Sequence, residues 1–151
     1  MRRPLAILAV LLVAGCGGSG RMSRKDFEQH LKRDAVLASR AAANAATAAG
    51  NSMQVYARRV ARAQEEMHQA AEDLDSLQPP KDAAADVDRI VVGLRFLDKE
   101  LGKLHHAAAT SNEAEAKAVS AAVDASPELR AVNGAIKDLQ RKGYDVGVFG
   151  S

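Results

Sequence analysis

The sequence has a single cysteine, no tryptophan and few aromatic residues of any kind. With Cys16 alone, no disulfide can form within the chain. Aromatic residues make up 3% of the sequence, so the rings on which nucleic-acid bases stack are scarce. The main apolar run covers residues 5–14, and about ten residues are too few for a membrane-spanning helix, which needs ~20.

A surplus of charge of either sign is also missing from most of the chain. The sequence has 21 Lys and Arg against 19 Asp and Glu. The difference of two equals Arg2 and Arg3, so the chain that follows them is formally neutral. Nucleic-acid-binding domains carry a basic surplus, and we therefore expect no nucleic-acid partner.

Residues 1–15 have the composition of an export signal. Arg2 and Arg3 precede the apolar run, and small residues follow it, which is the order of segments in a signal peptide. Val13, Ala14 and Gly15 stand directly before Cys16. This motif resembles the bacterial lipobox.

The lipobox resemblance implies a lipid anchor on Cys16. In that family the cysteine receives a diacylglycerol, and the signal is cut before it. Stable anchoring needs two acyl chains, because one chain binds only marginally. Residues 16–22 then form the lipidated cysteine and a flexible glycine-rich tether. We expect the protein on the outer face of the cytoplasmic membrane; the alternatives, a buried or a reactive thiol, fit this position poorly.

Residues 23–143 are rich in alanine, which has the highest intrinsic helix propensity. We predict an all-α fold, an antiparallel bundle of four helices joined by short links. The expected helices cover about residues 23–49, 52–77, 81–109 and 110–142. Ser126 and Pro127 resemble a new N-cap and first helical residue, so the fourth helix should break near them. One long bent helix through residues 50–51 is the alternative to a hairpin there.

Apolar residues recur at steps of three and four along each stretch, as in helices that share a core. Capping patterns mark the expected starts, with Ser23 before Asp26, Asn51 before Gln54 and Thr110 before Glu113. The expected stripes are Phe27, Leu31, Ala35, Ala38, Ala42, Ala45 and Ala49; Met53, Tyr56, Val60, Ala63, Met67, Ala70, Leu74 and Leu77; Val87, Ile90, Leu94, Leu97, Leu101, Leu104 and Ala108; and Leu129, Val132, Ile136 and Leu139.

Residues that could bind a metal or catalyse a reaction are few and scattered. Glu65 and His68 have the Glu-x-x-His spacing of di-iron bundles, but those sites need two such motifs and two further glutamates. His105 and His106 would point about 100° apart on a helix and cannot share one metal. No nucleophile elbow or phosphate loop occurs. We expect no catalytic residue, no metal, no cofactor and no enzymatic activity.

The last residues, 144–151, form a glycine-rich, non-helical tail after Gly143. Tyr144, Val148 and Phe149 are among the few large apolar residues of the chain. Two interpretations are open: these side chains fold back and close one end of the bundle, or they form an exposed apolar patch for a partner.

The chain is similar to small alanine-rich lipoproteins of actinobacteria and their relatives. The matching stretches are the lipobox, SRKDFEQH at residues 23–30, LQPPKDAAADVDRIVVGLRFL at 77–97 and DLQRKGYDVGVFG at 138–150. The resemblance implies location and helical fold, but no activity. We expect a non-catalytic module that contacts an envelope protein or cell-wall component. The alternative is a small-ligand or metal-binding lipoprotein, which a cavity lined by Met53, Met67 and Phe96 would favour.

Overall fold

The computed structural model describes residues 20–46 and 52–150, and within them it contains helices and no strand. The predicted signal with Val13, Ala14, Gly15 and Cys16 lies outside the described residues. The helices are α1 (Arg24–Ala46), α2 (Met53–Ser76), α3 (Ala84–Ala109), α4 (Glu113–Asp124), α5 (Pro127–Arg141) and a short 3-10 turn, η1 (Gly147–Gly150). The predicted all-α fold is confirmed.

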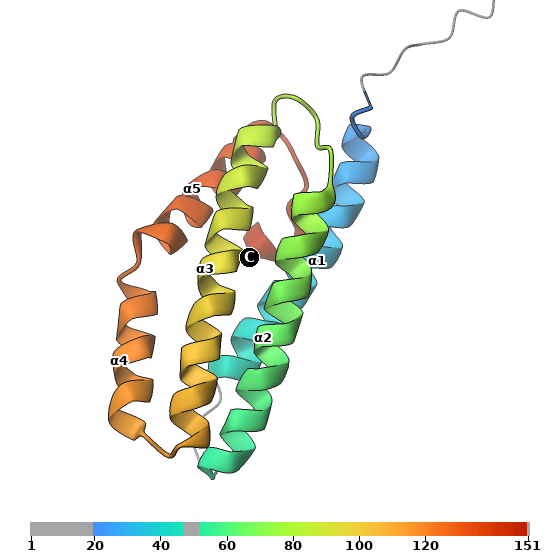
Figure 1. The fold of residues 1–151 in the computed structure, drawn as a ribbon. Coiled ribbons are helices and arrows are strands. Elements are labelled where there is room, and N and C mark those ends of the chain that lie inside the picture. The colour runs from blue at the N-terminus through green and yellow to red at the C-terminus, as the bar shows by residue number, and fades with distance from the viewer. Residues whose placement is uncertain (1–19, 47–51, 151) are drawn as a thin grey trace, which may run out of the picture.

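The helices form an antiparallel bundle in which α2 packs against both α1 and α3, and α3 carries α4 and α5 on its other side (Figure 1). Arg33 pairs with Asp73 at 3.2 Å, and Arg40 pairs with Glu66 at 3.7 Å. These pairs run in opposite directions along α1 and α2, so the two helices are antiparallel neighbours. The link itself, residues 47–51, lies outside the described residues.

The core follows the predicted apolar stripes closely in α2 and α3. Val60, Leu74 and Ile90 are completely buried, while Met53, Leu77 and Leu97 are partly buried at its margin. The stripe of α1 differs from the prediction at its C-terminal end. There Ala41 is buried and Ala42 is exposed, because a straight helix turns away from a strict seven-residue repeat.

The helix starts agree with the predicted caps at Ser23 and Ser126 and differ from them at α2 and α4. Ser23 forms the expected reciprocal contacts with Asp26. The N-cap of α2 is Ser52, whose hydroxyl accepts from Val55 N; Asn51 lies outside the described residues. The N-cap of α4 is Asn112 rather than Thr110. Thr110 instead ends α3, and its Oγ1 donates to the carbonyl of His106 at 2.9 Å.

The predicted break in the fourth stretch is confirmed between α4 and α5. The Ser126 hydroxyl accepts from Leu129 N at 3.2 Å, and Pro127 follows as the first residue of α5. Proline has no N–H to donate, which is harmless in the first turn of a helix. The break separates two unequal pieces: α5 buries Val132, Ile136 and Leu139 among others, whereas α4 buries only Val119.

Two further boundaries matter for the sites described below. Helix α3 begins at Ala84 rather than 81, because residues 81–83 form a turn in which the N–H groups of Ala83 and Ala84 donate to the Pro80 carbonyl. Helix α5 is followed by Gly143, whose positive φ of 81° favours glycine. This turn directs the chain back across α1.

Candidate functional site

The histidine and acidic residues singled out in the sequence do not come together. Glu65 is exposed, and His68 is 57% exposed with its Nδ1 3.1 Å from Asp98 Oδ2. This hydrogen bond raises the pKa of His68. Asp98 lies thirty residues further along the chain, so no local motif marks the pair. Across residues 20–46 and 52–150, no three His, Cys, Asp or Glu side chains are placed to share a metal ion.

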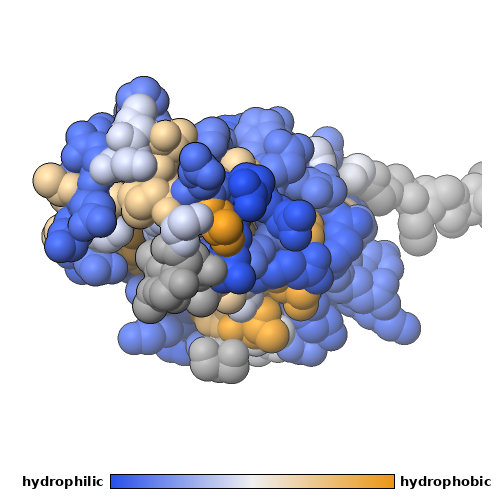
Figure 2. Space-filling view, turned by 90° about the horizontal axis from the view of Figure 1, so that it is seen from below, coloured by the Kyte–Doolittle hydropathy of each residue, from blue (hydrophilic) through white to orange (hydrophobic). Residues whose placement is uncertain are grey.

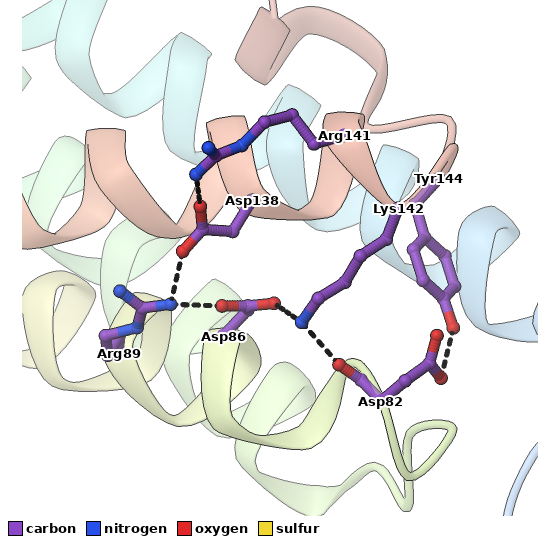
Figure 3. Close-up of polar contacts among 7 residues, drawn as sticks. All are labelled: Asp82, Asp86, Arg89, Asp138, Arg141, Lys142 and Tyr144. Carbon is purple, nitrogen blue, oxygen red and sulfur yellow. Dashed lines mark hydrogen bonds and ion pairs between the residues drawn. The ribbon is translucent and has the colours of Figure 1, made fainter.

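The most connected group of polar side chains lies where the start of α3 meets the end of α5 (Figure 3). This polar cluster centres on Asp86, whose side chain is only 1% exposed and accepts from Arg89 and from Lys142 Nζ, the latter at 2.6 Å. Its members are Asp82, Asp86, Arg89, Asp138, Arg141, Lys142 and Tyr144. Every carboxylate in it has a donor, which a buried charge requires.

The contacts of the polar cluster run in series through three parts of the chain (Figure 3). Arg89 joins Asp86 to Asp138 of α5, at 2.8 Å from the latter. Hydrogen bonds from Arg89 and Arg141 lower the pKa of Asp138. Lys142 also donates to the Asp82 carbonyl at 2.6 Å. With all of these groups paired, the polar cluster holds the start of α3, the end of α5 and the tail together.

Tyr144 extends the polar cluster into the C-terminal tail. Its hydroxyl donates to Asp82 Oδ1 at 2.8 Å, and its ring meets the edge of Phe27 with centroids 5.6 Å apart. The guanidinium of Arg24 lies 4.3 Å from the ring centroid. Burial and the neighbouring Asp82 carboxylate raise the pKa of Tyr144 to about 12. The phenol therefore stays neutral at physiological pH and keeps its proton for this hydrogen bond.

The tail as a whole lies against α1, as the fold-back interpretation expects, with two of the three predicted residues turned inward. Tyr144 is 5% exposed, whereas Val148 is 43% exposed and Phe149 is partly buried. The prediction for Val148 is therefore wrong as regards folding back. Val146, which the sequence analysis missed, is buried in its place. Its alternation with Tyr144 along an extended segment is the signal that could have identified it.

An ion pair fixes the tail on the outside. Lys32 Nζ lies 2.8 Å from Asp145 Oδ2, and the N–H of Asp145 donates to Glu28 at 3.2 Å. The Lys32 ammonium lowers the pKa of Asp145. Both charges are well exposed to water, so this pair contributes little to stability and serves to place the tail.

An apolar groove of about 460 Å³ lies between the C-terminal half of α1 and the splayed helix α4, with α3 at its base. Such a volume falls within the range of small-ligand sites. Met67 lines it, but Met53 and Phe96, expected around such a cavity, do not. The lining residues are Ala42, Ala45, Ala46, Met67, Leu97, Glu100, Leu101, Leu104, Val119, Ser120, Val123, Asp124 and Leu129.

A second cleft, of about 430 Å³, lies between α1 and the first turns of α2. It is lined by Asn44, Val55, Arg58, Arg59 and Arg62, and we call it the arginine cleft. The sequence analysis did not single out these residues, because it considered the net charge of the chain, and a net charge of zero does not reveal a local excess of arginine.

Helix α1 also buries two polar atoms that have no hydrogen-bond partner among the described residues. These are His30 Nδ1 and Asp34 Oδ2, one helical turn apart. The other oxygen of Asp34 accepts from Arg33 Nε at 3.1 Å. Burial raises the pKa of Asp34, because desolvation disfavours the charged form. The buried Asp34 carboxylate therefore lowers the stability of the fold, and its hydrogen bond with Arg33 offsets this loss only in part.

Comparison of the chain with models of protein families, with curated proteins and with solved structures finds no match.

Proposed function

We propose that the protein is a lipid-anchored envelope module, attached through Cys16 to the outer face of the cytoplasmic membrane and acting without catalysis. The observation that carries this proposal is the order of segments: a signal-like run, the Val13-Ala14-Gly15-Cys16 motif, and a helical domain that starts at residue 23. The resemblance to small alanine-rich lipoproteins agrees with it.

No helix in the described part of the chain is long and apolar enough to cross a membrane. The carboxylates of the polar cluster are all paired, which suits a structural role. An envelope protein or a cell-wall component is the partner we propose for the exposed surfaces of the helices.

Replacing Cys16 with alanine tests the anchor. We expect Cys16→Ala to prevent lipid addition and the cleavage that follows it, so that residues 1–15 stay attached and no diacylglycerol is present. Intact-mass measurement of the membrane-extracted protein checks this, with Ser19→Ala in the tether as the control that keeps lipid and cleavage. A wild-type protein that is mature but unmodified at Cys16 would contradict the proposal.

The apolar groove favours a second candidate function, the binding of a small apolar ligand. Nearly all of its lining is aliphatic, and Glu100, Ser120 and Asp124 supply its polar groups. This is the usual composition of a ligand pocket, which is mostly apolar with a few polar groups that orient the ligand. An elongated single-chain molecule, such as a fatty acid, matches such a lining.

A substitution that fills the groove tests the second function. Ala42 is exposed at the rim of the groove, so Ala42→Trp should occupy the space without disturbing the core. We expect a fluorescent fatty acid to bind the wild type saturably and the variant no longer. Ala43→Trp, at an exposed neighbour outside the lining, is the control. If both variants bound the fatty acid equally well, or if the wild type did not bind it, the proposal that the apolar groove binds a ligand would be wrong.

A further inference from the structure

The arginine cleft differs from every other arginine-bearing part of the described chain. Arg24, Arg33, Arg40, Arg89, Arg95 and Arg141 each have an acidic partner within 4 Å. Arg21 and Arg130 donate to backbone carbonyls. Arg58, Arg59 and Arg62 make no ion pair and no hydrogen bond within the described residues. Their donors are therefore available to a ligand.

The spacing of the three arginines gathers their charge in one place. Arg58 and Arg62 are four residues apart on α2, so their side chains leave the same face of the helix. Arg59 flanks them, and Asn44 of α1 and Val55 complete the wall of the cleft. Arginine offers a planar fork of donors that matches the paired oxygens of phosphate or carboxylate. Three such groups suit a doubly charged anion better than a singly charged one.

Nearby acids do not neutralise the cleft. Glu66 is already engaged, because it pairs with Arg40 and accepts from Asn44 Nδ2 at 3.3 Å. Glu65 is exposed on α2 and forms no ion pair with the three arginines. Between residues 35 and 64 the sequence contains no Asp or Glu at all. The local surplus of positive charge exists although the domain as a whole is balanced.

The cleft lies at the end of the bundle opposite to the tether. The chain enters the domain where Arg21 donates to the Pro79 carbonyl and Met22 N donates to Gln78, at the top of Figure 1. Asn44 follows Arg24 by twenty residues along α1, which corresponds to about 30 Å at 1.5 Å per residue. The opposite end of the bundle, seen from below in Figure 2, has hydrophilic residues around its edges and apolar residues between them. The arginine cleft therefore lies far from the point at which the anchoring lipid would hold the protein.

We propose that the arginine cleft binds a phosphate group carried by a molecule outside the bilayer. Arg58 and Arg62 provide charged donors from one face of α2, and Arg59 adds a third charge. This inference deepens the proposed function, since it gives the chemistry of the partner that the anchored module contacts. It concerns a site whose binding can be measured whether or not Cys16 is lipidated.

Titration of the purified full chain in non-ionic detergent tests this site. Inorganic phosphate and glycerol 3-phosphate serve as probes, and the arginine Nε signals in the NMR spectrum report where they bind. We expect the Arg58, Arg59 and Arg62 signals to shift saturably and acetate to bind more weakly. We expect Arg58→Gln/Arg62→Gln to weaken phosphate binding at least about tenfold, because charge-assisted hydrogen bonds are lost.

A variant with the same change in net charge provides the control. Lys117 of α4 and Lys137 of α5 are exposed and lie outside the cleft, so Lys117→Gln/Lys137→Gln should retain phosphate binding. Circular dichroism checks that both double variants keep their helices. Equal loss in the two variants, or no shift of the wild-type signals, would overturn the proposal.

The source of the phosphate is distinguished in a separate arm. Short-chain phosphatidylglycerol is added at the same concentrations, with short-chain phosphatidylcholine for comparison. Binding of the soluble phosphates that is as strong as binding of phosphatidylglycerol supports a partner outside the bilayer. Binding of phosphatidylglycerol alone would overturn the assignment in favour of a lipid headgroup. If the wild-type protein proved to be mature but unmodified at Cys16, the proposed lipid anchor would be wrong. The phosphate-binding results would still hold, because they do not depend on lipidation.

Discussion

Leu94→Asp is expected to unfold the domain, whereas Val92→Asp on the same helix should be nearly neutral. Leu94 is 2% exposed in the core, and Val92 is 60% exposed. The buried substitution removes apolar contacts and introduces a carboxylate without a partner, at a cost of about 4–6 kcal/mol. A domain of this size has only 5–15 kcal/mol of net stability, as a rough general range.

Circular dichroism and urea titration of the two variants measure this difference. The Leu94→Asp protein should lose most of its helical signal at low urea concentration, and the Val92→Asp protein should unfold with the wild-type midpoint. Leu101 is a second core residue of α3 and is 8% exposed. Leu101→Asp should therefore behave like Leu94→Asp. A Leu94→Asp variant with native midpoint would contradict the placement of α3 at the centre of the bundle.

Tyr144→Ala is expected to lower the free energy of unfolding by about 2–3 kcal/mol, since a large buried ring is removed. The variant also loses the hydrogen bond to Asp82 and the ring contacts with Phe27 and Arg24. For a domain of this length we expect a fall in melting temperature of roughly 10 °C. The polar cluster would lose its link to the tail.

Val148→Ala is the matched control for Tyr144, because Val148 belongs to the same tail but is 43% exposed. Its melting temperature should stay within about 2 °C of the wild type, as expected for surface substitutions. Calorimetry of both variants distinguishes a tail that closes the bundle from one that only lies on it. Unchanged melting of Tyr144→Ala would move the tail from a structural role to an exposed contact surface.

The sequence predicts the helices well because the signals for them are local. Ser126 and Pro127 favour a helix start through their own chemistry, and the apolar steps of α3 identify its buried side. The starts of α2 and α4 were less predictable, because Asn51 and Ser52, like Thr110 and Asn112, offer competing caps. Only the packing of neighbouring helices decides between such adjacent residues.

The sites were less accessible to sequence reasoning, because they join distant parts of the chain. Asp86 and Lys142 are 56 residues apart, and no spacing rule connects them. The arginine cleft could not be predicted, because its three arginines differ from the others only in having no acidic partner among the described residues. That difference becomes known only when the structure shows how the other arginines are paired. The burial of Val146 was not predicted for a simpler reason. A single valine between Asp145 and Gly147 offers less apolar area than the aromatic rings of the tail.

The weak attachment of α4 has a consequence for the dynamics of the molecule. With Val119 as its one buried residue, α4 can unfold locally at a small fraction of the global cost, whereas α2 and α3 can exchange their inner amides only when the whole bundle opens. The break at Ser126 and Pro127 separates such an opening from α5. Local opening of α4 would therefore widen the apolar groove on one side only, and the ligand proposed for it would enter there without disturbing the core.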